Sequence, residues 1–403
     1  MSERIDQSWL HHPSLQVLLG LLSEGDGEAR IAGGAVRNAL LGQAISDVDI
    51  ATTLVPRDVM LRLKAAGHKA VPTGIEHGTV TAVVDGDAYE VTTLRQDVET
   101  DGRHARVLYG TDWVADAARR DLTINALYLN ADGSLFDPLN GLPDVEAQNV
   151  RFIDDAETRI REDYLRILRF FRFFAWYGKF RPDADGLKAS TRLKAGLSDL
   201  SAERIWHELS RLLAAPDPGR AVLWMRQTGV LSQVLPETEK WGIDALPGLI
   251  EAEQRHGWEA DCLLRLMAIV PPMAERIDAL ASRLKLSKKV RSRLSQWSQV
   301  GDLQHALKKD GFYQWLYWQN TIAVADKLRL AIARDDDNSK KCLRQLKWLK
   351  RWERPQFPLK GQHLIDQGMT PGPAISEKMT QLEKIWVESN FAVSEEDLLD
   401  VAR

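Results

Sequence analysis

A Gly-Gly pair near the N-terminus has the residue types that can approach a phosphate. It lies in the stretch IAGGAVRNALLGQAISDVDIATT, residues 31–53. Gly33 and Gly34 stand between an expected buried strand and an expected helix over residues 35–41. Glycines between a strand and a helix let backbone N–H groups come close to a phosphate, at the positive end of the helix dipole. The pair therefore predicts a phosphate-binding turn.

Two aspartates follow in the same stretch. We expect a strand that starts at Ser46, on which Asp47 and Asp49 point to one face because side chains alternate along a strand. Adjacent carboxylates repel unless a cation lies between them, so this spacing predicts a divalent metal. A phosphate-binding turn beside a two-carboxylate metal site indicates phosphoryl or nucleotidyl transfer.

Each of these two features also has a simpler interpretation. A Gly-Gly pair is most often only a turn, and no Gly-Lys-Ser/Thr follows that would make it a Walker loop. An isolated Asp-x-Asp is most often a solvated strand end. The two features together, separated by one short helix, favour a functional site.

More polar residues that could join such a site follow downstream. Glu90 lies in YEVTT, on a strand that we expect beside the aspartate strand, although a surface acid is an equally simple interpretation. Arg119 and Arg120 precede Asp121, and an acid there could merely cap a helix. Asn125 lies four positions after Asp121, which would place both on one helical face. This spacing predicts a carboxylate and a carboxamide that could read one sugar.

A helical stretch further on, REDYLRILRF, carries a possible ion pair. Asp163 and Arg166 are three positions apart and would share a face of one helix over residues 161–170. The simple interpretation is a surface ion pair worth roughly 0.2–0.5 kcal/mol. We expect Leu165, Leu168 and Phe171 to face the core behind this pair.

Five motifs in a fixed order make the chain resemble a known family. They are GGAVRN with GQAISDVDIAT, RRDLTINAL, FDPLNG, EDYLR and, over residues 203–208, ERIWHE. The set resembles the class II tRNA nucleotidyltransferases, which include CCA-adding enzymes and bacterial poly(A) polymerases and have a polymerase-beta-like head. One departure is Asn38, where the family usually has Asp.

The resemblance implies a role for each matching residue. It implies that Asp47, Asp49 and Glu90 form the catalytic site, with Mg²⁺ on the two aspartates. Asp121 would recognise the ribose of the incoming nucleotide, and Asp163 with Arg166 would act as a protein template that reads the bases of CTP and ATP. The remaining nucleotide-binding residues would contact triphosphate and sugar: Gly33, Gly34, Arg37, Arg119, Arg120 and Asn125. We expect Glu203 and Arg204 to support the neck and not to be catalytic.

The composition is that of an ordinary soluble protein. The chain has 403 residues, 27% of them charged and 44% hydrophobic, and a net charge of −4. It contains no apolar stretch of ~18 residues for a membrane span, and its start lacks the apolar core of a signal peptide. Cys262 and Cys342 form neither a disulfide framework nor a zinc pattern. We therefore expect a cytoplasmic protein with no membrane contact.

The change in residue pattern along the chain predicts an α+β fold. Short β-branched runs dominate up to about residue 140, with a hairpin turn at Asp85-Gly86-Asp87 and a helix over residues 56–66, and helical periodicity follows to the end. The predicted parts are a catalytic head with its N-terminal helix, a helical neck that recognises the base, and a helical body and tail that bind tRNA. Their bounds are 1–140, 141–215, 216–354 and 355–403.

Two basic runs lie in the expected body. Residues 283–293 include Lys285, Lys288, Lys289, Arg291 and Arg293, and residues 340–354 include Lys347, Lys350 and Arg351. Tryptophans accompany them at 297, 348 and 352. A charge run is often only a solvated helix face, but these runs would also suit RNA, because an electrostatic footprint is local and the net charge does not exclude one.

The function that these observations favour is addition of C, C and A to tRNA 3′ ends from CTP and ATP, with two Mg²⁺ ions. The nearest alternative is a poly(A) polymerase of the same family, and an alternative of another class is a non-catalytic RNA-binding protein. The sequence leaves the oligomeric state open between monomer and homodimer.

The first testable prediction concerns residues 96–112, QDVETDGRHARVLYGTD. The resemblance implies that a flexible loop here allows the change from C to A addition, and the segment is polar and without a clear period. We expect deletion of Thr100 to Arg106 to preserve addition of two cytidines and greatly slow the terminal adenosine. Sequencing the 3′ ends of the product RNA measures this, with the full-length enzyme as control. Complete CCA from the shortened enzyme would show that the loop is not the switch.

Overall fold

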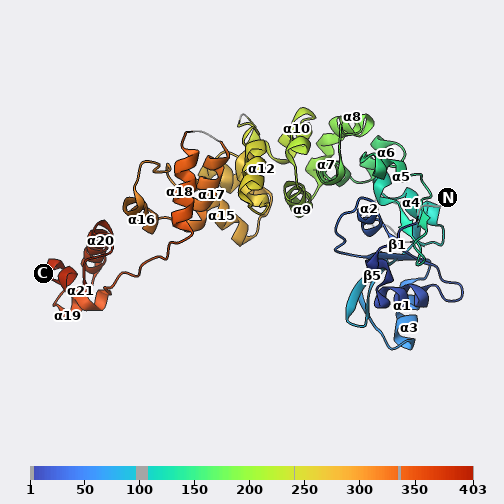
Figure 1. Cartoon of the computed structure of the whole chain (residues 1–403), viewed down its shortest axis with the longest axis horizontal. Coiled ribbons are helices and arrows are strands. Elements are labelled where there is room, and N and C mark those ends of the chain that lie inside the picture. The colour runs from blue at the N-terminus through green and yellow to red at the C-terminus, as the bar shows by residue number, and fades with distance from the viewer. Residues whose placement is uncertain (1–3, 97–107, 240, 335–336, 403) are drawn as a thin grey trace. The chain divides into compact units, whose positions relative to one another are not determined.

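The chain folds into two compact units. The computed structural model describes residues 4–96, 108–239, 241–334 and 337–402 (Figure 1). Unit 1 comprises residues 1–200 with 224–233, and unit 2 comprises residues 201–223 with 234–403. The division into head, neck, body and tail is finer than these two units and stays a prediction.

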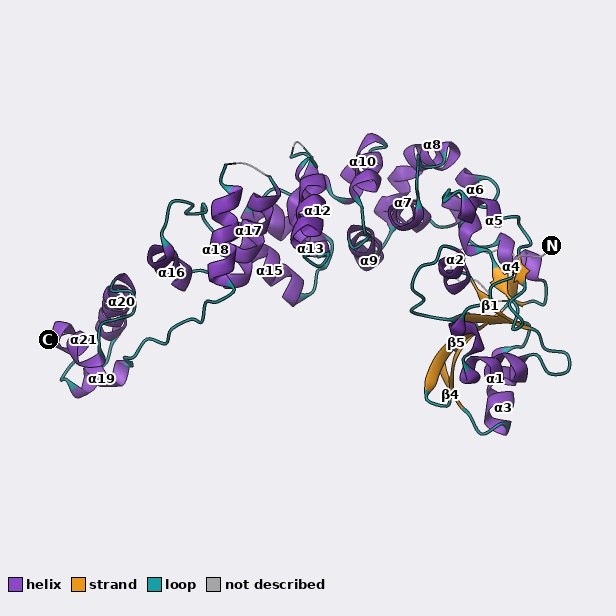
Figure 2. Cartoon of the chain, in the orientation of Figure 1, coloured by secondary structure: helices purple, strands orange, loops and turns teal. Residues whose placement is uncertain are grey.

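Unit 1 contains a seven-stranded mixed sheet in the order β3-β4-β5-β2-β1-β8-β9. Its strands are β1 (Ala29–Ala32), β2 (Asp49–Thr52), β3 (Lys69–Gly74), β4 (Thr79–Val84), β5 (Asp87–Thr93), β8 (Tyr128–Leu129) and β9 (Leu135–Phe136). A separate two-stranded ladder pairs β6 (Arg95–Gln96) with β7 (Leu108–Tyr109). Figure 2 shows the strands gathered in the N-terminal part of the described chain and helices in the remainder, which confirms the α+β fold.

The helices of the two units are as follows. Those of unit 1 are α1 (Pro13–Leu22), α2 (Gly34–Leu40), α3 (Pro56–Ala65), α4 (Trp113–Ala118), α5 (Leu142–Glu146), α6 (Ala156–Glu162), α7 (Leu165–Tyr177) and α8 (Ala184–Leu193). Two helices, α10 (Gly219–Gln227) and α11 (Val230–Val234), contribute residues to both units. Those of unit 2 are α9 (Ala202–Leu213), α12 (Ala245–His256), α13 (Cys262–Ile269), α14 (Ala274–Arg283), α15 (Lys288–Gln299), α16 (Lys309–Tyr317), α17 (Thr321–Ala333), α18 (Ser339–Leu349), α19 (Gly361–Asp366), α20 (Pro373–Glu388) and α21 (Glu395–Ala402).

The hairpin of β4 and β5 forms where the sequence predicts it. Asp85 and Gly86 have φ angles of 51° and 94°, which a two-residue turn of type I′ requires at both positions. The predicted helix over residues 56–66 is also confirmed as α3, which packs on β4 together with α1. The sequence analysis missed β3, an edge strand that includes Pro72 and has no buried residue.

Strand β2 lies in the middle of the sheet and determines which residues meet there. It pairs antiparallel with β1 and parallel with β5. This register places Asp49 opposite Ala32 on one side and opposite Glu90 on the other. Ile50, Ala51 and Thr52, which follow along β2, are all buried, so both faces of this central strand are covered.

Unit 2 has an ion pair inside its helical core. Arg265 is 2% exposed and Glu253 is 4% exposed, and Arg265 Nη2 donates to Glu253 Oε2 at 2.7 Å. The same guanidinium donates to the carbonyls of Leu213 (2.7 Å) and Ala215 (2.5 Å). Since these groups satisfy one another and are cut off from water, neither partner can be removed without leaving an unpaired charge.

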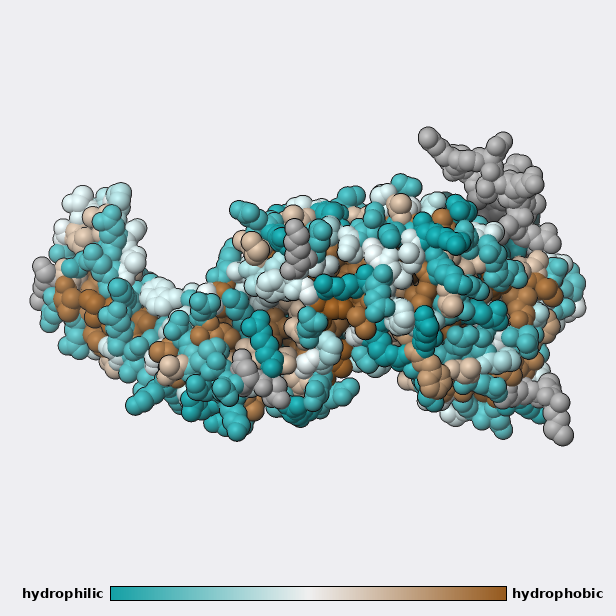
Figure 3. Space-filling view, turned by 90° about the horizontal axis from the view of Figure 1, so that it is seen from above, coloured by the Kyte–Doolittle hydropathy of each residue, from teal (hydrophilic) through white to brown (hydrophobic). Residues whose placement is uncertain are grey.

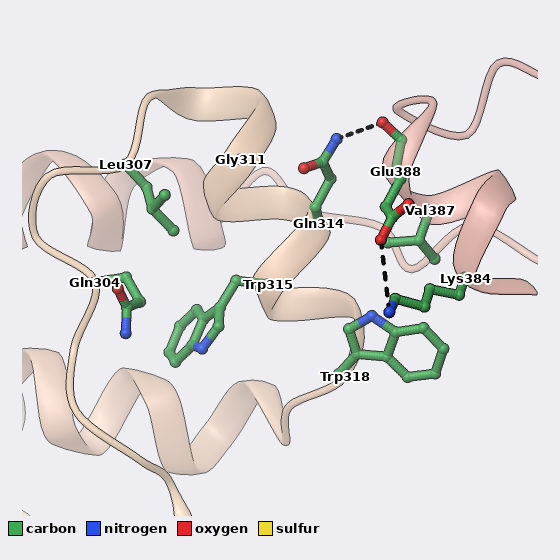
Figure 4. Close-up of a pocket in the computed structure, with 9 residues that line it drawn as sticks. All are labelled: Gln304, Leu307, Gly311, Gln314, Trp315, Trp318, Lys384, Val387 and Glu388. Carbon is green, nitrogen blue, oxygen red and sulfur yellow. Dashed lines mark hydrogen bonds and ion pairs between the residues drawn. The ribbon is translucent and has the colours of Figure 1, made fainter.

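The tail packs on α16 through aromatic and aliphatic residues, Tyr317, Leu382 and Trp386 among them. A pocket of about 350 Å³ lies beside this contact (Figure 4). Trp315 and Trp318 line it from the α16 side, and Lys384 lies 4.0 Å from Glu388 on α20. None of the predicted site residues lines this pocket.

Hydrophilic side chains cover most of the face drawn in Figure 3. Among the residues that the structure describes, no helix is both long enough and apolar enough to cross a membrane. Cys262 and Cys342 are both free thiols, as the sequence analysis expects.

The buried pair predicts a large loss of stability on truncation. Arg265→Ala leaves Glu253 charged and unpaired, and we expect it to lower the free energy of unfolding of unit 2 by about 3–5 kcal/mol. Chemical denaturation followed by circular dichroism measures this. The matched control is Arg255→Ala, which breaks an exposed Arg–Glu pair with Glu251 and should lower the free energy by less than about 1 kcal/mol. Equal effects of the two substitutions would contradict the prediction.

Candidate active site

The glycine turn between β1 and α2 allows a close approach of other elements. Gly33 has a φ of +62°, and a Cβ there would lie 3.1 Å from Arg120 Nη1 and 3.3 Å from the Asn125 carbonyl oxygen. A side chain at this position would therefore push apart the segments that carry Arg120 and Asn125. Helix α2 begins at Gly34, one residue earlier than the sequence predicts.

The structure brings the three predicted carboxylates close together, but not in the predicted way. The expected strand from Ser46 is wrong, because β2 begins only at Asp49 and Asp47 precedes it in a loop. Asp49 lies at the exposed end of β2, yet desolvation of its carboxyl group, followed by the charges of Glu90 and Asp47, raises its pKa. The charge of Arg120 opposes this rise. Glu90 is the register partner of Asp49, which confirms the predicted neighbouring strand.

The donor set fits a divalent ion that is shared with a substrate. In the described ranges, no three side chains of His, Cys, Asp or Glu converge closely enough to hold a metal by themselves. Mg²⁺ commonly takes only one or two carboxylates from a protein and completes its octahedron with water and substrate phosphates. Desolvation and, after it, the charges of Glu90 and Asp47 disfavour the charged form of Asp49, and a divalent cation would stabilise that form, so Asp47 and Asp49 suit this role.

Asp116, which the sequence analysis missed, organises the two adjacent arginines. It accepts from Arg119 Nε at 2.9 Å, from Arg120 Nη2 at 3.2 Å and from the Tyr128 hydroxyl at 2.7 Å. Burial would raise the pKa of Asp116, but the charges of Arg120 and Arg119 outweigh it and lower that pKa. The available signal was the spacing of three and four residues to the arginines. Two cations around one anion leave a net positive charge.

Asp121 and Asn125 meet, although not on a helical face. Helix α4 ends at Ala118, and Asp121 lies in the irregular segment before a 3₁₀ turn over Thr123–Asn125, so the helical prediction is wrong. Asn125 Nδ2 nevertheless donates to Asp121 Oδ1 at 3.2 Å. Asp121 Oδ2 accepts from Arg169 Nε at 2.5 Å. Burial of Asp121, which is 6% exposed, would raise its pKa, but Arg169 reverses this and lowers it.

Arg37 completes this group from α2. Its Nη1 donates to Asn125 Oδ1 at 2.5 Å and its Nη2 to the Tyr177 hydroxyl at 2.7 Å. The guanidinium also lies over the Tyr177 ring at 3.9 Å. Burial lowers the pKa of Arg37. Tyr177 and Arg169 both come from α7, so this helix helps to hold the polar groups of the sheet region.

Asn38 uses both ends of its amide. Its Oδ1 accepts from Arg37 Nη2 at 2.9 Å and from Nε at 3.2 Å, and its Nδ2 donates to the Ala44 carbonyl at 3.0 Å. The Asn38 carbonyl also accepts from the Gln43 N–H at 2.8 Å. Residue 38 therefore orients Arg37 and anchors the loop that leads to Asp47. The aspartate usual in the family would keep the first contact but has no N–H for the second.

The predicted template residues lie at a break between two helices. Helix α6 ends at Glu162, Asp163 is extended with φ −157° and ψ 108°, and α7 starts at Leu165, so the single helix over residues 161–170 is wrong. Asp163 Oδ1 accepts from the Leu165 N–H at 3.1 Å, which caps α7. Leu165, Leu168 and Phe171 are buried, as predicted.

Arg166, in the first turn of α7, is held by residues that precede this break. It forms an ion pair with Glu162, which the sequence analysis did not single out, and Nη1 donates to the Arg159 carbonyl at 2.9 Å. Its Nη2 donates to the Arg119 carbonyl at 3.4 Å. The base-reading candidate thus contacts the backbone of the Arg119–Arg120 segment directly.

Two further predictions concern the loop that includes Thr100 to Arg106 and the supporting role of Glu203. Thr100 to Arg106 are outside the described residues, but the β6–β7 ladder on either side of that gap is described, and the Arg95 N–H contacts Asp116 Oδ1 at 3.4 Å. Ser201 caps α9, where its hydroxyl accepts from the Arg204 N–H. Glu203 is exposed and forms an ion pair with Lys285 at 3.1 Å within unit 2.

Comparison with known proteins agrees with the motif order. The profile described as "Poly A polymerase head domain" matches residues 29–151, and that described as "Probable RNA and SrmB- binding site of polymerase A" matches residues 179–241. The mitochondrial CCA tRNA nucleotidyltransferase 1 of Danio rerio is 34% identical over 398 residues, which are 92% of this chain and 86% of the relative. The human protein of the same name is 34% identical over 405 residues, 96% and 88% of the two chains.

Solved structures show the same fold. The CCA-adding enzyme of Bacillus stearothermophilus in complex with CTP superposes with a TM-score of 0.77 at 25% identity, over 93% of this chain and 92% of that one. The Thermotoga maritima CCA-adding enzyme in complex with tRNA superposes with a TM-score of 0.70 at 20% identity, over 99% and 96%. With relatives that match over nearly its whole length, the chain belongs to the class II tRNA nucleotidyltransferase family.

Proposed function

We propose that this protein is a CCA-adding nucleotidyltransferase that extends tRNA 3′ ends from CTP and ATP. The observation that carries the proposal is the meeting of the Asp47, Asp49 and Glu90 carboxylates with the charge of Arg120. A site of this kind can receive a triphosphate and a metal together. Relatives named CCA tRNA nucleotidyltransferase match 92–96% of the chain.

The arginine groups supply charge for a triphosphate. Arg119 and Arg120 share Asp116, and Arg37 and Arg169 share the polar group of Asp121 and Asn125. Asp116 is one anion between two cations, so the Arg119–Arg120 pair has positive charge left for phosphate oxygens. Because the guanidinium groups are oriented before a nucleotide binds, little side-chain entropy is lost on binding.

Asp47 and Asp49 are the residues that we propose hold Mg²⁺, together with phosphates of the nucleotide. The ions would supply activation of the RNA 3′-hydroxyl and neutralisation of the pyrophosphate leaving group. Glu90 extends the acidic edge from the adjacent strand. No side-chain general base is required in this scheme, so the protein's own work is to bind and orient the two reactants.

Asp121, Asp163 and Arg166 would act on the nucleoside. Asp121 already accepts from Arg169, Asn125 and the Leu122 N–H, three of the roughly four acceptor sites of a carboxylate, which leaves one for a ribose hydroxyl. Arg166 contacts the Arg119 carbonyl, so a base read by Asp163 and Arg166 would lie next to the arginines that bind its phosphates. We place Gly33 and Gly34 at the phosphates, on the resemblance.

The family also contains poly(A) polymerases, which would use the same carboxylates and arginines, so the nucleotides added distinguish the two functions. A non-catalytic RNA-binding protein has less support, since Asp47, Asp49, Asp121 and their partners are intact. We propose that the activity depends on Mg²⁺. We also propose a cytoplasmic location, because neither cysteine is in a disulfide, while the animal relatives have "mitochondrial" in their names.

The carboxylate proposal predicts a selective loss of chemistry. Asp47→Ala and Asp49→Ala should each abolish incorporation of both CMP and AMP, because the metal loses half of its protein ligands. Binding of tRNA should change little, since phosphate contacts elsewhere dominate its affinity. Single-turnover incorporation and filter binding measure the two quantities. Asp58→Ala removes an exposed acid from α3 and is the control; near-normal turnover in an Asp47 or Asp49 variant would remove the metal role.

The two sets of contacts of the Asn38 amide predict a graded loss of activity in a series of Asn38 variants. Asn38→Leu deprives Arg37 of two hydrogen bonds and the Asp47 loop of its anchor, and we expect kcat/KM to fall roughly tenfold or more. Asn38→Asp retains an acceptor for Arg37 and loses only the donor to Ala44, so its kcat/KM should fall less than that of Asn38→Leu. Steady-state rates at several Mg²⁺ concentrations measure the series. If Asn38→Leu matches the unsubstituted enzyme, Asn38 does not position the site.

A further inference from the structure

The two basic runs of unit 2 differ in how their charges are used. In residues 283–293, cations pair with acids of the same unit: Arg283 with Glu237 (2.6 Å), Lys285 with Glu203 (3.1 Å), Arg291 with Asp278 (3.2 Å), and Arg293 with Asp261 (2.6 Å) and Asp326 (2.9 Å). The acids raise the pKa of Arg293. Most of this run therefore serves the fold, which argues against the RNA contact that its sequence suggested.

The second run forms an unneutralised stripe on α18. Lys340, Arg344, Lys347 and Arg351 are spaced by four, three and four residues, so they lie along one face of the helix and just past its end. All four are exposed, and none of them forms an ion pair with an acid of the described residues. We call these four residues the α18 stripe. It spans about 16 Å along the helix axis at 1.5 Å per residue.

The stripe is mounted on a well-packed helix. The opposite face of α18 buries Cys342, Gln345 and Leu346. Figure 1 shows α12, α17 and α18 close together, and all three are in contact through α17. Trp348 packs on Phe312, with ring centroids 5.9 Å apart, and the Arg344 guanidinium lies 5.2 Å from the Trp348 ring. The charges are thus presented from a fixed backbone.

Two of the tryptophans that accompany the basic runs pack inside unit 2 and are not available to stack on a base. Trp297 is only 3% exposed, and Trp352 packs on Tyr313 at 4.7 Å. An aromatic group from another part of the chain lies beside the stripe instead. Trp258 and His256, stacked at 5.1 Å, line a pocket of about 230 Å³ with Lys347 and Lys350.

The chemistry of this pocket favours a nucleic acid over an acidic protein or an apolar ligand. Its lining contains two lysines, a histidine and an indole, together with Leu343 and Leu346, and no carboxylate. Lys347 belongs to both the pocket and the stripe. Cations in a row suit consecutive phosphates of a backbone, and an adjoining aromatic pocket suits an unstacked base.

We propose that the α18 stripe, with the His256–Trp258 pocket at its side, binds the phosphate backbone of the tRNA substrate. The inference rests on the proposed function, since tRNA is the RNA that the enzyme would extend. It assigns tRNA affinity to the α18 stripe, whereas four cations of the other run, Arg283, Lys285, Arg291 and Arg293, are already paired with acids. The stripe lies outside the carboxylate and arginine groups and should affect binding without affecting chemistry.

A matched pair of triple variants tests the proposal in the full-length protein. The stripe variant is Lys340→Gln, Arg344→Gln and Lys347→Gln. The control is Lys285→Gln, Arg291→Gln and Lys384→Gln, which also removes two lysines and one arginine, all of them ion-paired. Both variants change the net charge by the same amount, so a general electrostatic effect would be equal in the two. Thermal unfolding checks that both remain folded.

The Kd for a tRNA that lacks its CCA end is measured over a range of salt concentrations. The stripe variant should reduce the slope of log Kd against log salt by about 0.7–0.9 for each phosphate that is no longer neutralised, about 2–3 in all, and the control should leave it unchanged. The KM for tRNA should rise while kcat at saturating tRNA stays the same. If the unsubstituted enzyme adds nucleotides but both variants keep its slope, the stripe does not bind tRNA. An equal decrease of the slope in both variants would also overturn the assignment.

Failure of the proposed function would look different, because then the unsubstituted protein itself would add no nucleotide to this tRNA. As a probe for another anionic partner, vesicles of phosphatidylserine and phosphatidylcholine should show no dependence on the stripe. Loss of vesicle binding in the stripe variant, with an unchanged tRNA slope, would replace tRNA by a lipid surface and overturn the proposal.

Discussion

Three carboxylates that the fold of unit 1 brings close together need positive charge nearby. Pairing of β2 with β5 places Asp49 next to Glu90, and the loop before β2 brings Asp47 near them; desolvation, and after it the charges of Glu90 and Asp47, raise the pKa of Asp49. A fold would not keep such a cluster for stability alone, since like charges at this separation are unfavourable. The nearby positive charge of Arg120 relieves the repulsion in part, and a bound divalent cation would relieve the remainder. The cluster is therefore most simply understood as a site for cationic ligands.

The surrounding residues position charge around this cluster. Asp116 holds two arginines from one side, and Asp121 holds Arg169 and Asn125 from the other. Gly33 permits the close approach because any side chain there would meet Arg120. Asn38 connects the arginine on α2 to the loop before the strand. Helix α7 contributes three residues to the site: Arg166 in its first turn, Arg169, and Tyr177 at its end. The sheet provides Asp49 and Glu90, the loop before β2 provides Asp47, and α2 and α7 provide Arg37, Arg166 and Arg169.

The sequence predicted the residue types of the site better than their backbone. The α+β class, the hairpin at Asp85-Gly86 and the pairing of the Glu90 strand with the aspartate strand follow from local patterns and are confirmed. Helical spacing failed at Asp121, which accepts from Arg169 on another helix, and at Asp163, whose carboxylate accepts from the Leu165 N–H at the break between α6 and α7. Asp116 and Glu162 were missed although their arginine partners lie three or four residues away, because such spacing is common on ordinary surface helices. The two basic runs look alike in sequence, and only the acids that the fold brings to residues 283–293 separate them. The functional roles of the site residues stay predictions.

One measurement tests the central claim most directly, namely that this site adds C, C and A in a defined order. The enzyme is incubated with Mg²⁺, CTP, ATP and a tRNA that ends at its discriminator base, and the product 3′ ends are sequenced. The account predicts a product longer by three nucleotides, with the sequence CCA, and growth that stops there. A long ladder of adenosines would assign the chain to the poly(A) polymerases of the family, and no incorporation in a folded preparation would contradict the account entirely.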